Sequence, residues 1–205
     1  MKSWRIILRL LSVCLLLGVS LDLRAADDLS LARTDLARLQ QRYGEKHPKV
    51  LDQQIRVIEL ERLSKTAATE PPVLRTARVE LAVMLTHYAE NHPKLRAQVL
   101  RVVELERQCQ IDPALPSELL EARGELAALG TRYGLDNPRI IAAQSRVRAL
   151  EKYLLAPGPE SHELRLARAE LDQLSERYGP NHPKLQRLAD RIAILEQGRS
   201  VAPGQ

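Results

Sequence analysis

Three histidines recur in the same context along this 205-residue chain. His47, His92 and His182 each follow a tyrosine by four residues and each precede a proline. Imidazole is a general acid or base near neutral pH and the commonest nitrogen ligand of metal ions. Three such groups would form a metal site if the fold brought them together.

A further occurrence of the same motif argues against both kinds of chemistry. There the residue at the histidine position is Asn137. Asparagine is a poor metal ligand but a good helix N-cap, and an imidazole nitrogen can accept a backbone N–H in the same way. We therefore expect these four residues to cap helices or to pack at a hairpin tip, and we expect no metal and no cofactor.

A catalytic nucleophile is also hard to find in this sequence. The serines do not recur in register with the motif, and none stands in a recognisable catalytic order with a histidine and an acid. His162 is isolated between two copies of the motif, and no glycine-rich phosphate loop or CxxC pair occurs. The sequence predicts a protein that is not an enzyme.

The motif belongs to a 45-residue repeat that is written four times without a gap. The copies occupy about residues 26–70, 71–115, 116–160 and 161–205. The candidate site residues are those of the repeated tip: Tyr43, His47, Pro48, Tyr88, His92, Pro93, Tyr133, Asn137, Pro138, Tyr178, His182 and Pro183. A period of this length is typical of helical repeat proteins.

Hydrophobic spacing predicts two helices of about 15 residues in each copy. Before the tyrosine, apolar residues lie three and four apart, in the fourth copy Leu164, Ala167, Leu171 and Leu174. After the proline the same spacing resumes, there with Leu185, Leu188, Ile192 and Leu195. Such heptad seams are typical of helices that pair along their length. The middle position of the second seam is Gln53, Gln98, Ala143 and Leu188 in the four copies, so this helix is partly polar at its centre.

Charged residues beside the seam indicate how the two helices pair. In an antiparallel hairpin, Arg33 of the first helix meets Glu61 of the second on one side, and Asp35 meets Arg56 on the other. Both pairs are opposite in sign in all four copies. This pattern favours antiparallel, coiled-coil-like hairpins, although each exposed pair contributes only about 0.2–1 kcal/mol.

The residues after each tyrosine predict how the first helix ends. Gly44, Gly134 and Gly179 occupy this position, and we expect each to adopt the left-handed conformation that commonly ends a helix. Ala89 stands there in the second copy, where that conformation would be strained. We expect the tyrosine ring to pack on the proline, which suits the first position of the next helix.

Two further patterns concern the stacking of the hairpins. Linkers of ten proline-containing residues are predicted at 64–73, 109–118 and 154–163. A second apolar stripe on the second helix is expected to join consecutive hairpins. It comprises Leu51, Ile55 and Ile58 in the first copy and Leu100 and Val103 in the second, and it fades in the third and fourth. This gradient predicts an α-solenoid or elongated array with its polar cap at the C-terminal end.

The first 25 residues predict export of the protein. Basic residues precede an apolar run over 10–21, and Ala25 offers a cleavage site before Ala26, as in a secretory signal peptide. The run is shorter than the about 20 residues that span a bilayer, so we expect no stable membrane span. Lipid attachment at Cys14 is an alternative that Val13 disfavours. The predicted location is the periplasm or the exterior, with a mature chain of residues 26–205.

The composition of the mature chain narrows the choice of partners. It keeps 27 basic and 25 acidic residues, and this net charge of +2, with signs interspersed, does not favour nucleic acid. Cys109 is its one cysteine, which leaves burial and pairing between molecules as alternatives. It has no Phe or Trp, so its core is predicted to be Leu, Val, Ile, Ala and the repeated Tyr.

The segment 177–185, Arg-Tyr-Gly-Pro-Asn-His-Pro-Lys-Leu, and its counterparts at 42–50 and 87–95 resemble two known families. One is the helix-hairpin segment of bacterial polysaccharide chain-length determinant (co-polymerase) proteins. Those proteins are anchored in the inner membrane at both ends and generally carry one or two such segments, whereas this chain has four and no second membrane helix. The segment is also similar to tetratricopeptide repeats of the kinesin-light-chain type, which are shorter than 45 residues and lack the proline-rich linkers.

Together these patterns predict an exported, all-α protein of four tandem antiparallel hairpins that acts as a scaffold or protein-interaction module. A protein partner is expected, and a homo-oligomer is left open. The alternative, implied by the first resemblance, is an accessory factor in the assembly or regulation of exported polysaccharide.

Overall fold

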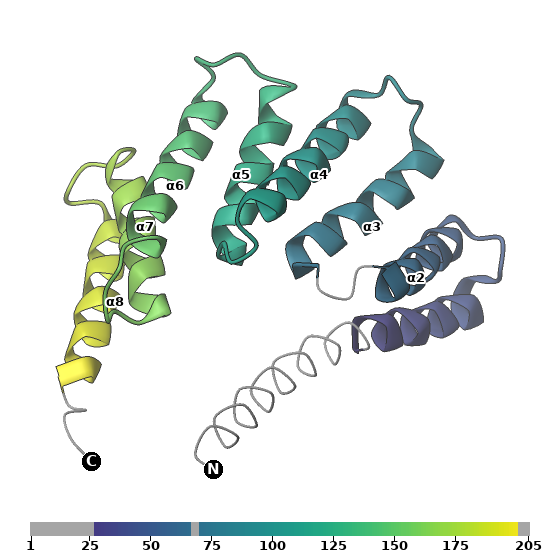
Figure 1. Ribbon diagram of the computed structural model, residues 1–205, viewed down its shortest axis with the longest axis horizontal. Helices are drawn as coiled ribbons and strands as arrows, with labels where there is room; N and C mark the ends of the chain where they lie inside the picture. Colours follow the sequence, from purple (N-terminus) through teal and green to yellow (C-terminus); the bar gives the residue numbers. More distant parts are fainter. Residues whose placement is uncertain (1–26, 67–69, 201–205) are drawn as a thin grey trace, which may run out of the picture. The chain divides into compact units, whose positions relative to one another are not determined.

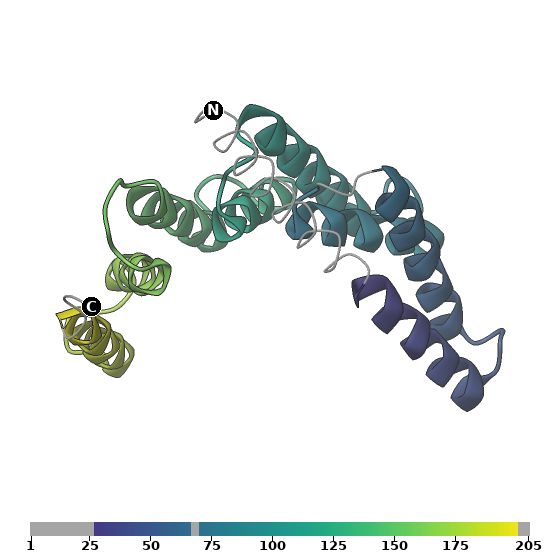
Figure 2. The same ribbon diagram turned by 60° about the horizontal axis from the view of Figure 1, so that its bottom comes forward.

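The computed structural model of the chain describes residues 27–66 and 70–200, so the predicted signal peptide and its cleavage site lie outside the described residues. Every regular element in this part of the chain is an α-helix, and it contains no strand (Figure 1, Figure 2). Contacts divide the chain into two units, the first ending at Gln98 and the second beginning at Val99, and each is described by itself.

Each copy of the repeat contributes two helices, as predicted. The first described helix covers residues 27–43. The helices that follow are α2 (Pro48–Thr66), α3 (Pro72–His87), α4 (Pro93–Ile111), α5 (Ser117–Gly130), α6 (Pro138–Leu154), α7 (His162–Ser175) and α8 (Pro183–Ser200). Helices adjacent in the sequence pack together, namely α2 with α3, α5 with α6, α6 with α7 and α7 with α8. The prediction of an all-α array of adjacent helix pairs is confirmed.

The hairpin core is built from the predicted seam. In the fourth copy, Leu164 and Ala167 of α7 form a buried cluster with Leu188 and Ile192 of α8. The other seam residues pack against this cluster, namely Leu171, Leu174 and Leu195. The 3–4 spacing thus places one apolar face of each helix against the other, and Figure 2 shows α7 and α8 side by side.

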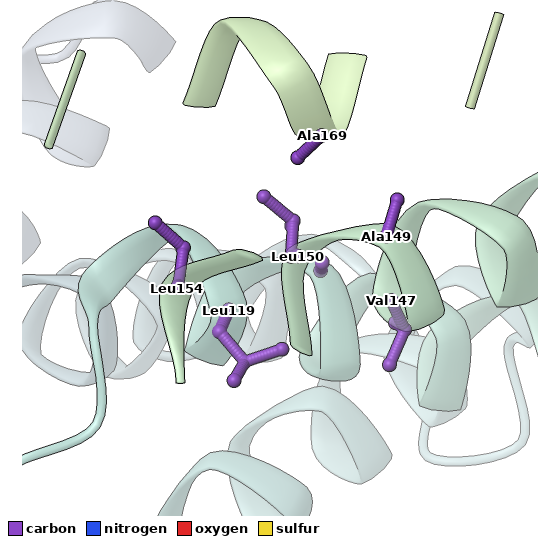
Figure 3. Close-up of a cluster of buried hydrophobic side chains, with 7 residues drawn as sticks. Leu119, Val147, Ala149, Leu150, Leu154 and Ala169 are labelled. Atoms are coloured by element: carbon purple, nitrogen blue, oxygen red, sulfur yellow. The ribbon is translucent and has the colours of Figure 1, made fainter. Parts of the chain in front are cut away.

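A second buried cluster joins three consecutive helices (Figure 3). Leu119 of α5 lies in it with Val147, Leu150 and Leu154 of α6, and Ala169 of α7 also belongs to it. Since α7 begins the fourth copy, this cluster extends from the seam of the third hairpin to the contact between the third and fourth copies. The apolar core is therefore shared by neighbouring copies within this unit.

The polar centre of the second helix is satisfied inside the hairpin. Gln53 Nε2 donates a hydrogen bond to the Ala32 carbonyl oxygen over 2.9 Å. Gln98 Nε2 does the same to Ala77 over 2.9 Å and also donates to Glu80 over 3.1 Å. Buried amides need such partners, so these bonds explain how a polar residue is tolerated at a seam position.

Ion pairs on one side of the seam confirm the antiparallel direction. The distance between the arginine nitrogen and the glutamate oxygen is 2.6 Å for Arg33–Glu61, 2.6 Å for Arg123–Glu151 and 2.7 Å for Arg168–Glu196. On the other side, the third copy forms the Arg146–Glu125 pair at 2.8 Å. In the described first and fourth copies, Asp35–Arg56 and Glu170–Arg191 form no ion pair, so the expectation for this side holds only in part.

A double-mutant cycle on Arg33 and Glu61 tests this pairing. We expect Arg33→Glu to lower the free energy of unfolding and Glu61→Arg to restore part of the loss, with a coupling of about 0.2–1 kcal/mol because both groups are exposed. Arg168 is a poorer choice because it also contacts Glu160. Urea denaturation at low and high salt measures the coupling, which salt should weaken. Zero coupling at low salt would contradict a stabilising pair.

The linkers between hairpins are shorter than predicted. α3 begins at Pro72, and α2, α4 and α6 continue to Thr66, Ile111 and Leu154, inside the stretches expected to be irregular. Proline is tolerated in the first turn of a helix, where its missing N–H needs no partner. In α6 the additional residue, Leu154, is buried, which favours the longer helix.

The end of the first helix differs from the prediction in three copies. Gly44 alone among the described glycines has a positive φ, +76°, and no described residue other than glycine has one. α5 and α7 already end at Gly130 and Ser175, so Gly134 and Gly179 lie beyond the helix stop. Ala89 is therefore not in a left-handed conformation, and the predicted strain there is wrong.

Alanine substitutions at two of these glycines should have opposite effects. Gly44→Ala is expected to cost about 1–2 kcal/mol, because φ is positive although a Cβ would meet nothing within 4 Å. Gly179→Ala is expected to stabilise by about 0.4–1 kcal/mol, because its φ is ordinary and alanine restricts the unfolded chain. Chemical denaturation of both variants measures the difference. Equal effects would mean that the two turns share one conformation.

The second apolar stripe does not stack the hairpins as predicted. Leu51 and Ile58 of α2 remain 46% and 65% exposed, and Leu100 and Val103 of α4 are exposed as well. Other side chains supply buried contacts between copies. Ala169 of α7, for example, lies in the cluster beside α6.

Candidate interaction sites

The residue before each tip proline caps the second helix of its hairpin. These residues are His47, His92, Asn137 and His182. Each accepts a hydrogen bond from the backbone N–H two residues later. The donor-to-acceptor distances are 3.2 Å for Lys49 to His47 Nδ1, 3.2 Å for Lys94 to His92 Nδ1, 3.0 Å for Arg139 to Asn137 Oδ1 and 3.3 Å for Lys184 to His182 Nδ1. Pro48, Pro93, Pro138 and Pro183 each begin a helix directly after this cap.

In three of the four tips the tyrosine ring stacks on the cap residue. The ring centroids are 4.5 Å apart for Tyr43–His47, 4.2 Å for Tyr88–His92 and 4.1 Å for Tyr178–His182, with the rings nearly parallel. In these three copies the tyrosine ring therefore stacks on the imidazole that caps the next helix. In the third copy, which has no imidazole, the Tyr133 hydroxyl accepts a hydrogen bond from Arg139 over 2.5 Å.

Basic side chains lie over the tyrosine rings in all four copies. The distance from the charged group to the ring centroid is 5.5 Å for Lys49, 5.7 Å for Lys94, 5.2 Å for Arg139 and 5.8 Å for Lys184. All four are within the range of cation–π contacts. Arg42 and Arg177 make similar contacts with Tyr43 and Tyr178. These contacts give the recurring basic residues a role inside the tip itself.

A groove between the first and second copies has aliphatic side chains along one wall, with Asp52 and Gln54 beside them. Leu51, Ile55 and Ile58 of α2 form one wall, and Thr86 and His87 near the end of α3 form the other. Leu51 and Ile58 are largely exposed, so their apolar surface is available to a partner. Unlike scattered single residues, these three lie on one face of one helix, at spacings of four and three.

The corresponding groove between the third and fourth copies has a different chemistry. There Ser145 stands where the first groove has Ile55, and Arg148 stands where it has Ile58. Ser145 hydrogen-bonds to Glu176, which directly follows α7, and Arg148 lies 3.6 Å from the same carboxylate. A polar contact also crosses the first groove, between Asp52 and His87, but there Ile55 and Ile58 keep part of the α2 wall aliphatic.

Two further histidines join consecutive copies. His87 Nε2 of α3 lies 2.5 Å from Asp52 Oδ1 of α2, and His162 Nε2 of α7 lies 3.0 Å from Glu118 Oε1 of α5. Burial alone would raise the pKa of Glu118, but the hydrogen bond from His162, with others from its own backbone and from Ser117, outweighs burial and lowers that pKa. Sequence reasoning missed both bridges, because only the packing of one copy on the next reveals them.

The described part of the chain has neither a cluster of metal ligands nor a membrane-spanning helix. No three His, Cys, Asp or Glu side chains there are grouped so as to hold a metal ion. Within the same residues, no helix combines the length and apolar character needed to cross a bilayer. The Cys109 side chain is half-buried.

Comparison with models of known protein families, with curated protein sequences and with solved structures found no match.

Proposed function

We propose that this protein is an exported, non-enzymatic scaffold whose four hairpins form an α-solenoid and bind a protein partner. The observation that carries the proposal is the aliphatic groove lined by Leu51, Ile55 and Ile58, next to α3. Export is supported by the N-terminal sequence pattern, and the solenoid by the packing of α2 on α3 and of α6 on α7. In both of these contacts, the second helix of one copy packs on the first helix of the next.

The chemistry of the groove favours a protein ligand. Its exposed wall consists of branched aliphatic side chains, which gain most from excluding water and make few directional bonds. A groove between two helices suits the apolar face of a helix, with side chains at i, i+3 or i+4. The first groove is the better candidate because it has Ile55 and Ile58 where the corresponding groove of the last two copies has Ser145 and Arg148, which contact Glu176.

Site-specific photo-crosslinking tests the proposed surface. A photo-reactive amino acid at Ile58 in the producing cells should give a discrete protein adduct, which mass spectrometry can identify. The matched control is Ala193, the corresponding exposed position of α8, which should give none. Adducts of the same identity at both positions, or no protein adduct at Ile58, would contradict the proposal.

Binding to the captured partner then checks the role of the groove. Ile58→Asp should weaken binding by about tenfold or more, because it places a charge on the aliphatic wall. Ala193→Asp should leave binding unchanged. Since both positions are exposed, each variant should stay within about 0.5 kcal/mol of the parent in stability. Equal binding by the two variants would place the interface elsewhere.

A further inference from the structure

All five histidines of the chain are engaged in one of two arrangements. Three of them, His47, His92 and His182, accept a backbone N–H at Nδ1 and cap a helix. The other two, His87 and His162, place Nε2 against a carboxylate oxygen of an earlier helix. The two arrangements respond to a proton in opposite ways, because they use different ring nitrogens.

In the capping arrangement, the neutral imidazole must carry its proton on Nε2, because Nδ1 accepts the hydrogen bond. A second proton can bind only at Nδ1, where it removes the acceptor and faces the backbone N–H of Lys49, Lys94 or Lys184. It also puts a positive charge at a helix N-terminus, which the helix dipole disfavours. Protonation therefore opens the cap.

The charged surroundings of these three caps reinforce this effect. Each imidazole stacks on the tyrosine four residues before it, and cations lie near the same tyrosine rings. These cations are Lys49 with Arg42, Lys94, and Lys184 with Arg177. In the described part of the chain, no carboxylate forms an ion pair with His47, His92 or His182.

In the bridging arrangement, a proton has the reverse consequence. Nε2–H of His87 donates to Asp52, and Nε2–H of His162 donates to Glu118, which also accepts from Ser117. A second proton binds at Nδ1, so the existing hydrogen bond remains and becomes a bond between opposite charges. Such charge-assisted bonds are stronger than neutral ones.

We propose that the five histidines make this fold respond to acidification in two opposite ways, at the hairpin tips and at the contacts between copies. When acidification adds a proton to the capping imidazoles, the tips of copies one, two and four loosen. When it adds a proton to the bridging imidazoles, the contacts between copies one and two and between copies three and four tighten. The tip of the third copy, capped by Asn137, does not respond.

Nuclear magnetic resonance of the full, isotope-labelled chain tests the proposal residue by residue. At pH 7.5, the imidazole nitrogens of all five histidines should show the Nε2–H form. On acidification to pH 5.5, solvent exchange of the Lys49, Lys94 and Lys184 amides, corrected for intrinsic rates, should rise about fivefold or more. The Arg139 amide provides the internal control and should not change. A uniform response of all four amides, or none, would overturn the proposal.

Conservative variants separate the effect of the capping histidines from that of the bridging histidines. Replacing the capping histidines together, as His47→Asn, His92→Asn and His182→Asn, keeps an acceptor and should abolish the acid-induced exchange. In that background, the melting temperature should rise between pH 7.5 and 5.5, because only the bridges respond. Adding Asp52→Asn and Glu118→Gln should remove this rise, since an amide accepts the hydrogen bond without a charge. Acid-induced amide exchange that persists in the asparagine variant would refute the proposed opening of the caps. A rise in melting temperature that survives the amide substitutions would refute the proposed strengthening of the bridges.

Discussion

Replacing Leu119 by alanine is expected to lower the free energy of unfolding by about 2–5 kcal/mol. Leu119 is 0% exposed and lies in the cluster that joins α5, α6 and α7. The substitution removes buried methyl groups and leaves a cavity, because the surrounding helices relax only in part. Because the cluster also contains Ala169 of the fourth copy, the loss should extend beyond the third hairpin. Equilibrium denaturation followed by circular dichroism measures it.

Leu135→Ala is the matched control for this prediction. Leu135 belongs to the same copy and is 78% exposed. Surface substitutions away from special features usually change stability by less than about 0.5 kcal/mol. A loss at Leu119 no larger than the loss at Leu135 would mean that this cluster is not the core of the unit. Hydrogen exchange on α7 would show whether the destabilisation reaches the fourth copy.

The paired helices could be predicted from the sequence because the determinants of a hairpin are local and repeated. The 3–4 spacing of Leu164, Ala167 and Leu171 specifies which face of the helix is buried, wherever the helix lies. The opposite charges of Arg33 and Glu61 then specify the direction of the partner. Both features depend only on residues within one 45-residue copy.

The groove and the histidine bridges could not be predicted in the same way. They depend on which face of one hairpin meets the next, and two faces of α2 carry apolar residues. The stripe of Leu51 and Ile58 looked suited to that contact, yet it remains exposed. Asp52 and His87 are 35 residues apart and belong to different copies, so no pattern within one copy relates them.

The caps and the turns show the same distinction on a smaller scale. Capping by His47 follows from residue chemistry and position alone, because the side chain needs only its own helix N-terminus. The conformation of Gly134 and Gly179 depends instead on where the preceding helix ends. In those copies the helix ends early, at Gly130 and Ser175, so a glycine is present without a left-handed backbone.

Ala167→Leu should destabilise the protein by about 1–3 kcal/mol through overpacking. The four copies all have alanine at this seam position, Ala32, Ala77, Ala122 and Ala167. Ala167 is 3% exposed, and it contributes to the cluster with Leu164 of its own helix and Leu188 of α8. In the first two copies the alanine carbonyl accepts the buried amide of a glutamine from the second helix, so the helices approach closely here.

The control for this substitution is Ala189→Leu on α8. Ala189 lies next to the buried Leu188 but on the exposed side of the helix, so the added methyl groups meet solvent. Alanine and leucine are both good helix formers, so propensity changes little in either variant. A selective loss at Ala167, measured by urea denaturation, would show that a close approach of α7 and α8 requires a small residue. If both variants were equally stable, the seam would have room for leucine, and the alanine at this position would need another explanation.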